Sequence, residues 1–303
     1  MADKTIKRAA FAGSWYPGTA DACKSAIQTF LSEAQSVSGA TGDQAESTGT
    51  ALGGIVPHAG WVYSGSIACR VIASLAPEEP KPSVDTVVLF GAHMHPTSQA
   101  FVLKEGGVET PLGDIPVDRE LTDELVSSLT GSGQHIQSIS PDSFPDENTL
   151  ELQYPFIRHF FPDSRIVICG VPPTELAEQI GYAAVDAARS LGRRFRIIGS
   201  TDMTHYGPNF GFEPAGSGTA AVEWVKDSND AGAIRSLEAM DVTGILNQGL
   251  SRMNMCCAGA AAAAAAACQR AGALRGCCVD YATSWEKSRS DSFVGYSGVV
   301  FIG

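Results

Sequence analysis

The stretch SRIVICGVPPTELAEQIGYAAVDAARSLGRRFRIIGS, residues 164–200, decides the fold. It begins and ends with short apolar runs, residues 164–171 and 195–200, which are typical of strands buried on both faces of a sheet. Between these runs, residues 174–191 have the spacing of an amphipathic helix. A strand, a helix and a second strand in this order predict two parallel strands joined by a crossover helix.

The same alternation extends in both directions along the chain. Two further buried strands are predicted at residues 51–56 and 84–91. Two further helices are predicted at residues 20–34 and 118–129. Near the C-terminus, residues 276–287 and 293–302 are β-rich, and we expect them to complete the sheet as an antiparallel pair. The sequence therefore predicts a single α/β domain over residues 1–303, with a central, mostly parallel mixed sheet and helices on both faces.

Two segments have a distinctive composition. Residues 35–50 are rich in Ser, Gly and Thr and lack aliphatic periodicity, which predicts a flexible surface loop. Residues 260–267 are consecutive alanines. Because alanine is the strongest helix former and has a small side chain, this run predicts a helix packed closely in the core.

Composition and charge exclude several classes of protein. The net charge of −12 argues against a nucleic-acid binder and against a binder of anionic membranes, because both need basic surfaces. The N-terminal residues lack the apolar run of a signal peptide, and the chain has no long apolar stretch, so we expect a cytoplasmic protein without a membrane span. The eight cysteines have neither the density of a disulfide framework nor a CxxC zinc spacing.

Histidines follow the predicted strands at the points where those strands end. His58 follows residues 51–56, His93 and His95 follow residues 84–91, and Asp202 and His205 follow residues 195–200. In open α/β sheets the carboxyl ends of the strands form the ligand-binding edge. We therefore expect these side chains to share one site.

The spacing within these segments suits metal binding. His93 and His95 form an HxH pair, which on an extended segment would direct both rings to one side. Cys256 precedes the alanine run, and the N-terminus of a helix favours a thiolate. Imidazole and thiolate together suit iron, copper or zinc better than magnesium or calcium. Asp202, three residues before His205, is placed to orient that imidazole or to share a metal with it.

A separate acidic segment, residues 145–156, contains Glu147 and Glu151. Four residues separate these two carboxylates, so they lie on one face if the segment is helical. Either one could act as a general base or as a metal ligand. Glu151 is the stronger candidate because it lies in the apolar part of the segment.

Taken together, the motifs resemble those of the Memo family, whose bacterial members are called AmmeMemoRadiSam system protein B. The resemblance rests on six segments in the family's order, which are FAGSWYPG at 11–18, PHAGWVYSG at 57–65, GAHMH at 91–95, ENTLELQYPF at 147–156, GSTDMTHYG at 199–207 and MCC at 255–257. It covers nearly the whole chain. It implies a fold similar to that of the class III extradiol ring-cleaving dioxygenases, with a non-haem metal pocket.

The resemblance also implies roles for individual residues. His58 and Cys256 match family metal-site residues, and Asp202 and His205 match a motif that lines the same cavity. The family pattern G-P-(S/N)-H places its histidine at Met94, so either His93 or His95 supplies that ligand, or the site is altered.

The family's H-S-x-E-x-H segment is also changed. Glu151 is retained as a catalytic candidate, while Asn148 and Gln153 stand at the two histidine positions.

Three functional hypotheses follow. The first is a metal-dependent, dioxygenase-like protein that holds iron or copper, with zinc as a further possibility, and acts with a radical-SAM protein and an AMMECR-type protein. The second is a non-catalytic protein whose pocket recognises a small molecule, a peptide or a partner. The third is a metal-free hydrolase with a Cys256–His205 dyad, which requires the two side chains to lie within hydrogen-bond reach.

Overall fold

The computed structural model describes residues 5–38, 49–77 and 83–303, and a mixed sheet forms the centre of this part of the chain. Its strand order is β10-β12-β2-β9-β3-β8-β4-β7, with β11 beside β12. The middle strands are parallel to one another and lie in the order β2 (Ala51–Val56), β9 (Phe195–Ser200), β3 (Thr86–Gly91) and β8 (Arg165–Gly170). The predicted α/β class and the mostly parallel sheet are confirmed.

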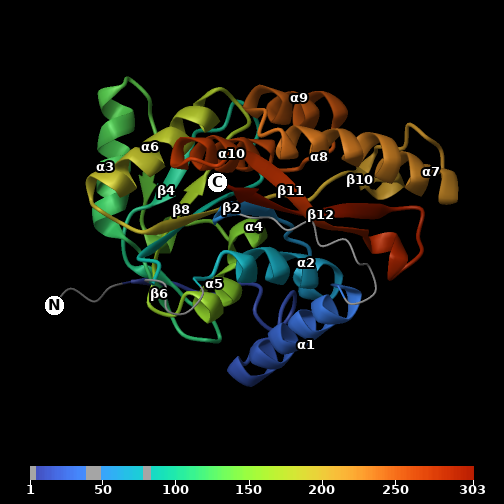
Figure 1. Ribbon diagram of the computed structural model, residues 1–303, viewed down its shortest axis with the longest axis horizontal. Helices are drawn as coiled ribbons and strands as arrows, with labels where there is room; N and C mark the ends of the chain where they lie inside the picture. Colours follow the sequence, from blue (N-terminus) through green and yellow to red (C-terminus); the bar gives the residue numbers. More distant parts are fainter. Residues whose placement is uncertain (1–4, 39–48, 78–82) are drawn as a thin grey trace.

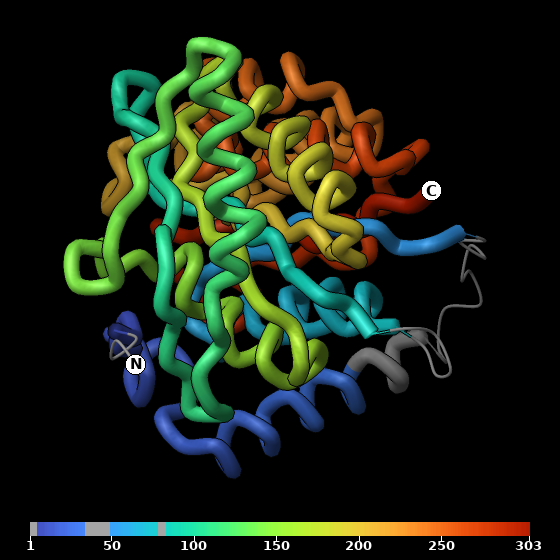
Figure 2. Tube along the Cα trace, turned by 90° about the vertical axis from the view of Figure 1, so that its left-hand side faces the viewer, coloured from blue at the N-terminus to red at the C-terminus, as the bar shows by residue number. Residues whose placement is uncertain are grey.

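Helices cover both faces of the sheet (Figure 1). One face carries α3 (Arg119–Gly131), α6 (Leu176–Ser190), α8 (Ala231–Glu238), α9 (Val242–Arg252) and α10 (Ala258–Ala271). The other face carries α1 (Ala20–Ser38), α2 (Trp61–Ser74) and α5 (Tyr154–Phe160). Figure 2 shows the same two groups of helices on opposite sides of the strands. Each face has its own hydrophobic core.

The alanine run forms most of α10, which is buried along nearly its whole length as predicted. Small side chains let this helix lie very close to its neighbours. A Cβ atom added to Gly181 of α6 would lie 2.4 Å from the carbonyl oxygen of Ala263. A Cβ atom added to Gly199 of β9 would lie 2.7 Å from the Cβ of Ala264. The close approach of α6, α10 and β9 therefore depends on glycine and alanine.

The C-terminal segments form the antiparallel pair that the sequence predicts. Strand β11 (Arg275–Thr283) pairs with β12 (Phe293–Ile302), and β12 pairs in turn with β2. The short strand β10 (His205–Tyr206) also pairs with β12. This pairing places His205 beside the end of the parallel strands.

The remaining elements are short. They are β1 (Ile6–Lys7), β4 (Phe101–Leu103), β5 (Gly107–Val108), β6 (Ile115–Pro116), β7 (Gln137–Ile139), α4 (Asn148–Glu151), α7 (Thr219–Trp224), a π-helical turn (Val225–Asp230) and the 3-10 turns Pro141–Ser143, Pro208–Phe210 and Ser284–Glu286. Strands β1, β5 and β6 form a small separate sheet.

The predicted loop at residues 35–50 needs a correction at its start. Helix α1 continues to Ser38, so residues 35–38 are helical. The good helix formers Glu33, Ala34 and Gln35 lead into this segment, and its first glycine is Gly39. Residues 39–48 lie outside the described residues.

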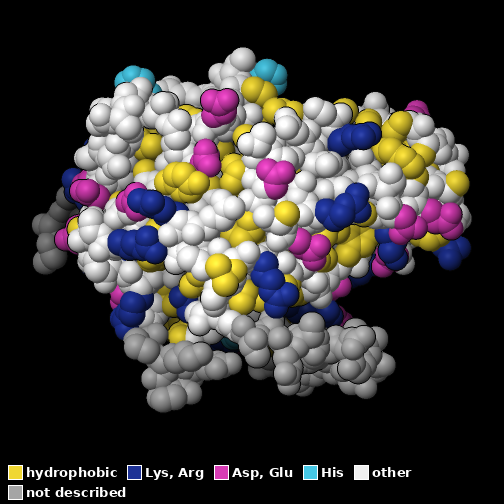
Figure 3. All heavy atoms as spheres, turned by 45° about the horizontal axis from the view of Figure 1, so that its top comes forward, with side chains coloured by type: hydrophobic (Ala, Val, Ile, Leu, Met, Phe, Trp, Pro, Cys, Tyr) yellow, Lys and Arg dark blue, Asp and Glu magenta, His cyan; other side chains and the backbone are white. Residues whose placement is uncertain are grey.

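The surface is mixed in charge. On the face shown in Figure 3, acidic and basic side chains of the described residues are interspersed with hydrophobic ones. Among the helices within the described ranges, none combines the length and the apolar character needed to cross a bilayer.

Candidate metal centre

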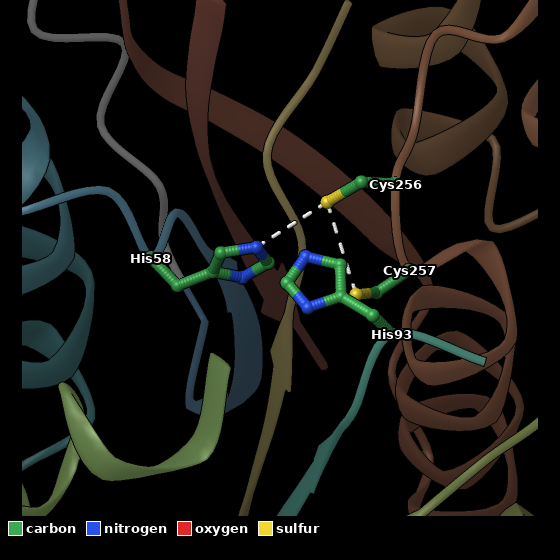
Figure 4. A group of neighbouring side chains, drawn as sticks. All are labelled: His58, His93, Cys256 and Cys257. Carbon is green, nitrogen blue, oxygen red and sulfur yellow. Dashed lines mark hydrogen bonds between the residues drawn. The ribbon is translucent and has the colours of Figure 1, made fainter. Parts of the chain in front are cut away.

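Four side chains converge where the parallel strands end. His58 follows β2, His93 follows β3, and Cys256 and Cys257 precede α10. One nitrogen or sulfur atom from each residue lies within 4.8 Å of the corresponding atom of every other. The four side chains point toward a common space (Figure 4). The strand ends thus bring together residues that are far apart in the sequence.

His58 is buried and is fixed at three points. Its Nε2 atom lies 3.3 Å from the Cys256 Sγ, and its Nδ1 atom lies 3.1 Å from the Ser200 Oγ. Its backbone N–H donates a hydrogen bond of 2.7 Å to the Asp202 carboxylate. One ring nitrogen contacts Ser200, so the other ring nitrogen faces the Cys256 sulfur. Histidines that bind metals commonly have this arrangement, in which the nitrogen that does not bind the metal makes a hydrogen bond.

The backbone turns sharply between β3 and His93. Ala92 has a φ of 75°, which is uncommon for a residue other than glycine. The turn places the His93 ring edge-on to the His58 ring, with 5.1 Å between the ring centres. The His93 Nδ1 atom lies 3.0 Å from the Glu147 carboxylate. The side chain of His93 remains 43% exposed, so the centre opens to solvent on this side.

His95 takes a different direction. Its Nδ1 atom lies 2.8 Å from the Thr97 hydroxyl, and it is not a member of the converging group. The expectation that both rings of the HxH pair face one side is therefore wrong, because the segment is turned and not extended. Of the two alternatives, the structure brings His93 to the cluster.

Hydrogen bonds from the end of β9 hold the two cysteines. The Cys256 N–H donates to the Asp202 carbonyl at 3.2 Å, and the Cys257 N–H donates to the Thr201 hydroxyl at 3.0 Å. The Asp202 N–H in turn donates to the Cys256 Sγ at 3.3 Å. The turn before α10 is thus fixed to the carboxyl end of the sheet.

The charges in the cluster favour a thiolate at Cys256. Burial opposes its ionisation, but Cys257, His58 and the nearby His205 lower the pKa of the Cys256 thiol well below its ordinary value. Burial also opposes the charged form of His58, whereas Asp202 and Cys256 raise the pKa of His58. The pKa of His93 is likewise raised, against its partial burial, by Cys256 and Glu147. A thiolate is the form of cysteine that binds metals.

Asp202 and His205 lie at the edge of the cluster. The Asp202 Oδ2 atom is 3.9 Å from both the His58 Nε2 and the His205 Nε2. Burial raises the pKa of Asp202, and the two imidazoles partly oppose that effect. The His205 Nε2 atom is buried and has no hydrogen-bond partner of good geometry, although the Cys256 sulfur lies near enough to raise the pKa of His205.

The two glutamates of the acidic segment contact different parts of the protein. Glu147, at the start of α4, reaches His93, as described above. Glu151, at the end of α4, accepts hydrogen bonds from the Ala10 and Phe11 N–H groups and from the Tyr16 hydroxyl. The hydrogen bonds of Glu151 therefore hold the N-terminal segment, residues 10–16, against α4.

The residues at the two altered histidine positions contact the backbone around His58. The Asn148 side chain donates to the His58 carbonyl at 3.3 Å, and the Gln153 side chain donates to the Pro57 carbonyl at 2.9 Å. Gln153 also lies 3.5 Å from the Ser200 hydroxyl, and its Oε1 atom is buried without a partner. Both side chains therefore support the loop that carries His58.

Sequence reasoning missed two contributors to this centre, namely Cys257 and Ser200, and it named Glu147 as a candidate without its contact to His93. The adjacency of Cys257 to Cys256 was a usable signal, since both sulfurs reach the same space. Ser200 is the last residue of β9 and adjoins the strand-end group, which was also a usable signal. The contact between Glu147 and His93 depends on the turn at Ala92, which the sequence does not reveal.

The donor set fits a transition-metal ion. Two imidazole nitrogens and two sulfurs in one space are ligands suited to iron, copper or zinc. The unpartnered Nε2 atom of His205 at the edge of the centre is a further polar group that lacks an intramolecular partner. The residues present therefore agree with a bound metal.

Comparisons with known proteins agree with the motifs. Residues 7–300 match the Memo-like protein family. A MEMO1 family protein of Thermococcus onnurineus is 32% identical over 306 residues, which cover 98% of this chain and 99% of the relative. A MEMO1 family protein of Pyrococcus abyssi is 33% identical over 82% of this chain and 85% of the relative. Similarity extends over almost the whole length of the chain.

Proposed function

Because the chain belongs to the Memo-like protein family, we propose that it is a metal-dependent protein whose ion is bound by His58, His93 and Cys256. Iron or copper is the preferred ion in this proposal, with zinc as the alternative. The observation that supports it best is the convergence of imidazole and thiol groups from β2, β3 and the start of α10 on one solvent-accessible space. Cys257 is available as a fourth ligand.

Hydrogen bonds from the surrounding residues orient the proposed ligands toward a metal. Ser200 holds the Nδ1 side of His58, so the Nε2 side is free for the ion. Glu147 holds the Nδ1 side of His93 in the same way. The Asp202 N–H stabilises negative charge on the Cys256 sulfur. An iron or copper ion, when bound by these residues, would supply a Lewis acid and one-electron redox chemistry.

His205 and Asp202 are the proposed acid–base groups. The unpartnered Nε2 atom of His205 is free to accept or donate a proton at a ligand bound beside the metal. Burial lowers the pKa of His205, but the Cys256 sulfur and, to a smaller extent, Asp202 at 3.9 Å raise it above its ordinary value and favour the protonated imidazole. A dioxygenase-like reaction, and a fold of the class III extradiol dioxygenase type, belong to this proposal.

Metal analysis tests the proposal. The protein purified without added metal is compared with a His58→Ala/Cys256→Ala variant, and both are then titrated with Fe(II), Cu(I) and Zn(II) under reducing conditions. We expect about one ion per chain in the wild-type protein and a loss of binding in the variant. Equal and negligible metal in both proteins would overturn the proposal.

A cavity whose wall includes the two residues after His58 supports a second function, the recognition of a small molecule or a peptide. Its volume is about 710 Å³, and its lining includes Trp15, Trp61 and Tyr63 together with Ala59 and Gly60, which directly follow His58. Trp15 and Tyr63 are partly exposed. Cavities of this size with aromatic walls hold organic ligands.

The two functions are distinguished by removing the metal ligands. If the protein only recognises a ligand, the His58→Ala/Cys256→Ala variant retains ligand binding, measured through a change in tryptophan fluorescence that Trp15→Phe reduces. If the ligand is a substrate of the metal centre, its conversion stops in that variant.

The family resemblance also supports the proposal that the protein acts, in the cytoplasm, with a radical-SAM protein and an AMMECR-type protein. Co-purification of the three proteins from one host tests the partnership. Their failure to associate, and the absence of both genes from the host genome, would contradict it.

A further inference from the structure

The sulfurs of Cys256 and Cys257 lie next to each other at the start of α10. The two Sγ atoms are 3.8 Å apart, and Cys256 is partly exposed while Cys257 is 3% exposed. We propose that these two residues are an oxidative modification site, at which a peroxide converts the two thiols into a vicinal disulfide. A consequence, which rests on the proposed metal binding, is that oxidation releases the metal.

Adjacency in the sequence does not by itself bring two thiols together, as the second adjacent pair shows. Cys277 and Cys278 lie in strand β11, where successive side chains point to opposite faces. Accordingly, Cys277 packs against the core on the α2 face and Cys278 against the core on the α10 face. This pair is therefore a natural control within the same chain.

The backbone at residues 256–257 is a turn, and the turn is what brings the two sulfurs to the same side. Cys257 is the N-cap of α10, with φ −125° and ψ 53°, and is not part of an extended strand. Its N–H is fixed by Thr201 and the N–H of Cys256 is fixed by the Asp202 carbonyl. Figure 4 shows the two sulfurs directed toward each other and toward the histidine rings.

The order of the reaction follows from exposure. Cys256 is the more accessible sulfur, so it attacks one oxygen of hydrogen peroxide; the O–O bond breaks, and Cys256 becomes a sulfenic acid as the first water leaves. The Cys257 sulfur then attacks the Cys256 sulfur, the S–O bond breaks, and the second water carries away the oxygen. Two thiols are oxidised by two electrons and one peroxide is reduced to two waters.

The disulfide removes ligands from the centre. Its sulfurs no longer carry negative charge, so the soft ligands of the site are lost and only His58 and His93 of the converging group remain. A centre that holds its metal through thiolates therefore loses it on oxidation. Reduction of the disulfide by a small thiol restores both ligands.

The first experiment uses the full-length, reduced, metal-free protein and hydrogen peroxide. Wild-type protein is expected to lose the mass of two hydrogen atoms and, at the same time, two sites of thiol alkylation. Tandem mass spectrometry of the tryptic peptide Met253–Arg270 should place the change at residues 256–257. Cys277→Ser/Cys278→Ser should behave as the wild type does. Two alkylatable thiols that persist at residues 256–257 after peroxide treatment would overturn the proposal.

A variant at the second cysteine makes the test specific. In Cys257→Ser the sulfenic acid on Cys256 has no neighbouring thiol, so the protein should gain an oxygen atom and should not lose hydrogen. Cys257→Ala is the second variant if the serine variant does not fold. Loss of two hydrogen atoms from either variant would assign the disulfide to other cysteines.

The experiment that tests metal release uses zinc, because peroxide does not oxidise the zinc ion itself. Zinc-loaded wild-type protein is treated with peroxide, and released zinc is measured with a chromogenic chelator. Zinc release that parallels disulfide formation supports the switch, whereas a disulfide formed with zinc still bound overturns the release. A reduced protein that binds no metal but forms the disulfide contradicts the proposed function and supports the modification site.

Discussion

The Cys256 Sγ atom lies 3.3 Å from the His58 Nε2 atom, although 198 residues separate the two in the sequence. The contact joins the start of α10 to the end of β2, and α10 also packs against β2 and β9. The tight packing of the alanine helix on the sheet therefore sets the distance between the two ligands. Single substitutions can show which residues bind the metal directly and which only hold those ligands in place.

The histidine pair after β3 gives the first prediction. His93→Ala should lower the zinc affinity of the reduced protein at least ~100-fold, since loss of a ligand costs no less than loss of its supporting residues. His95→Ala should leave the affinity unchanged, because His95 contacts Thr97 and lies outside the converging group. Competition with a chelator of known affinity measures both. A larger loss in His95→Ala than in His93→Ala would reverse the assignment of the ligand.

Ser200 gives the second prediction. The Ser200 hydroxyl contacts the Nδ1 atom of His58, so Ser200→Ala should weaken zinc binding by ~10–100-fold through a poorly oriented imidazole. The nitrogen chemical shifts of His58 should also show a changed balance of its two neutral tautomers. Ser98→Ala, which removes a hydroxyl beside His95, is the matched control. Unchanged shifts and affinity in Ser200→Ala would show that Ser200 does not position the ring.

The sequence predicted the strands because their signals are local. Continuous apolar runs such as residues 84–91 and 195–200 mark buried strands, and the parallel order follows from the helices between them. Since the carboxyl ends of parallel strands meet at one edge, the meeting of His58, His93 and Asp202 could be expected before any coordinates were known.

The finer assignments depend on contacts between distant segments. The choice between His93 and His95 is made by the positive φ of Ala92, and a pattern of residue types does not reveal such a turn in a residue other than glycine. The contribution of Cys257 depends on a turn held by Thr201, which lies 56 residues away. Such contacts form only when the sheet is assembled.

Glu151 gives the third prediction, which separates a structural role from a catalytic one. Glu151→Gln replaces a buried carboxylate that accepts three hydrogen bonds from the N-terminal segment, so the free energy of unfolding should fall by ~1.5–3 kcal/mol. Zinc affinity should stay within a few-fold of wild type.

The control lies in the same region. Glu109 also accepts a hydrogen bond from this segment, at the Ala9 N–H, but its other partner, Arg8, is exposed. Glu109→Gln should therefore cost less than about 1 kcal/mol. Urea denaturation measures both variants. A stable Glu151→Gln variant with impaired metal chemistry would favour the catalytic role.

Asp230 gives the last prediction, a dependence of stability on pH. Its carboxylate is buried behind the centre, where it accepts hydrogen bonds from the Thr204 N–H and hydroxyl and from the Tyr281 hydroxyl. Burial nevertheless raises the pKa of Asp230 from 3.8 to about 6, because these hydrogen bonds and, least of all, the nearby His205 oppose that rise only in part. Tyr281 and His205 are the titratable groups that face it.

The sign of the effect follows from the higher pKa in the folded state. Between about pH 4 and pH 6 the folded protein keeps the proton that the unfolded chain releases, so the free energy of unfolding falls as the pH rises and levels off above about pH 6. A shift of this size corresponds to ~3 kcal/mol. Asp230→Asn removes the titration, so the stability of the wild type relative to this variant should fall by ~2–3 kcal/mol from about pH 4 to about pH 7. Urea denaturation of both proteins at the two pH values measures the difference. If the two proteins lose stability equally between these pH values, the pKa of Asp230 is not raised in the folded protein.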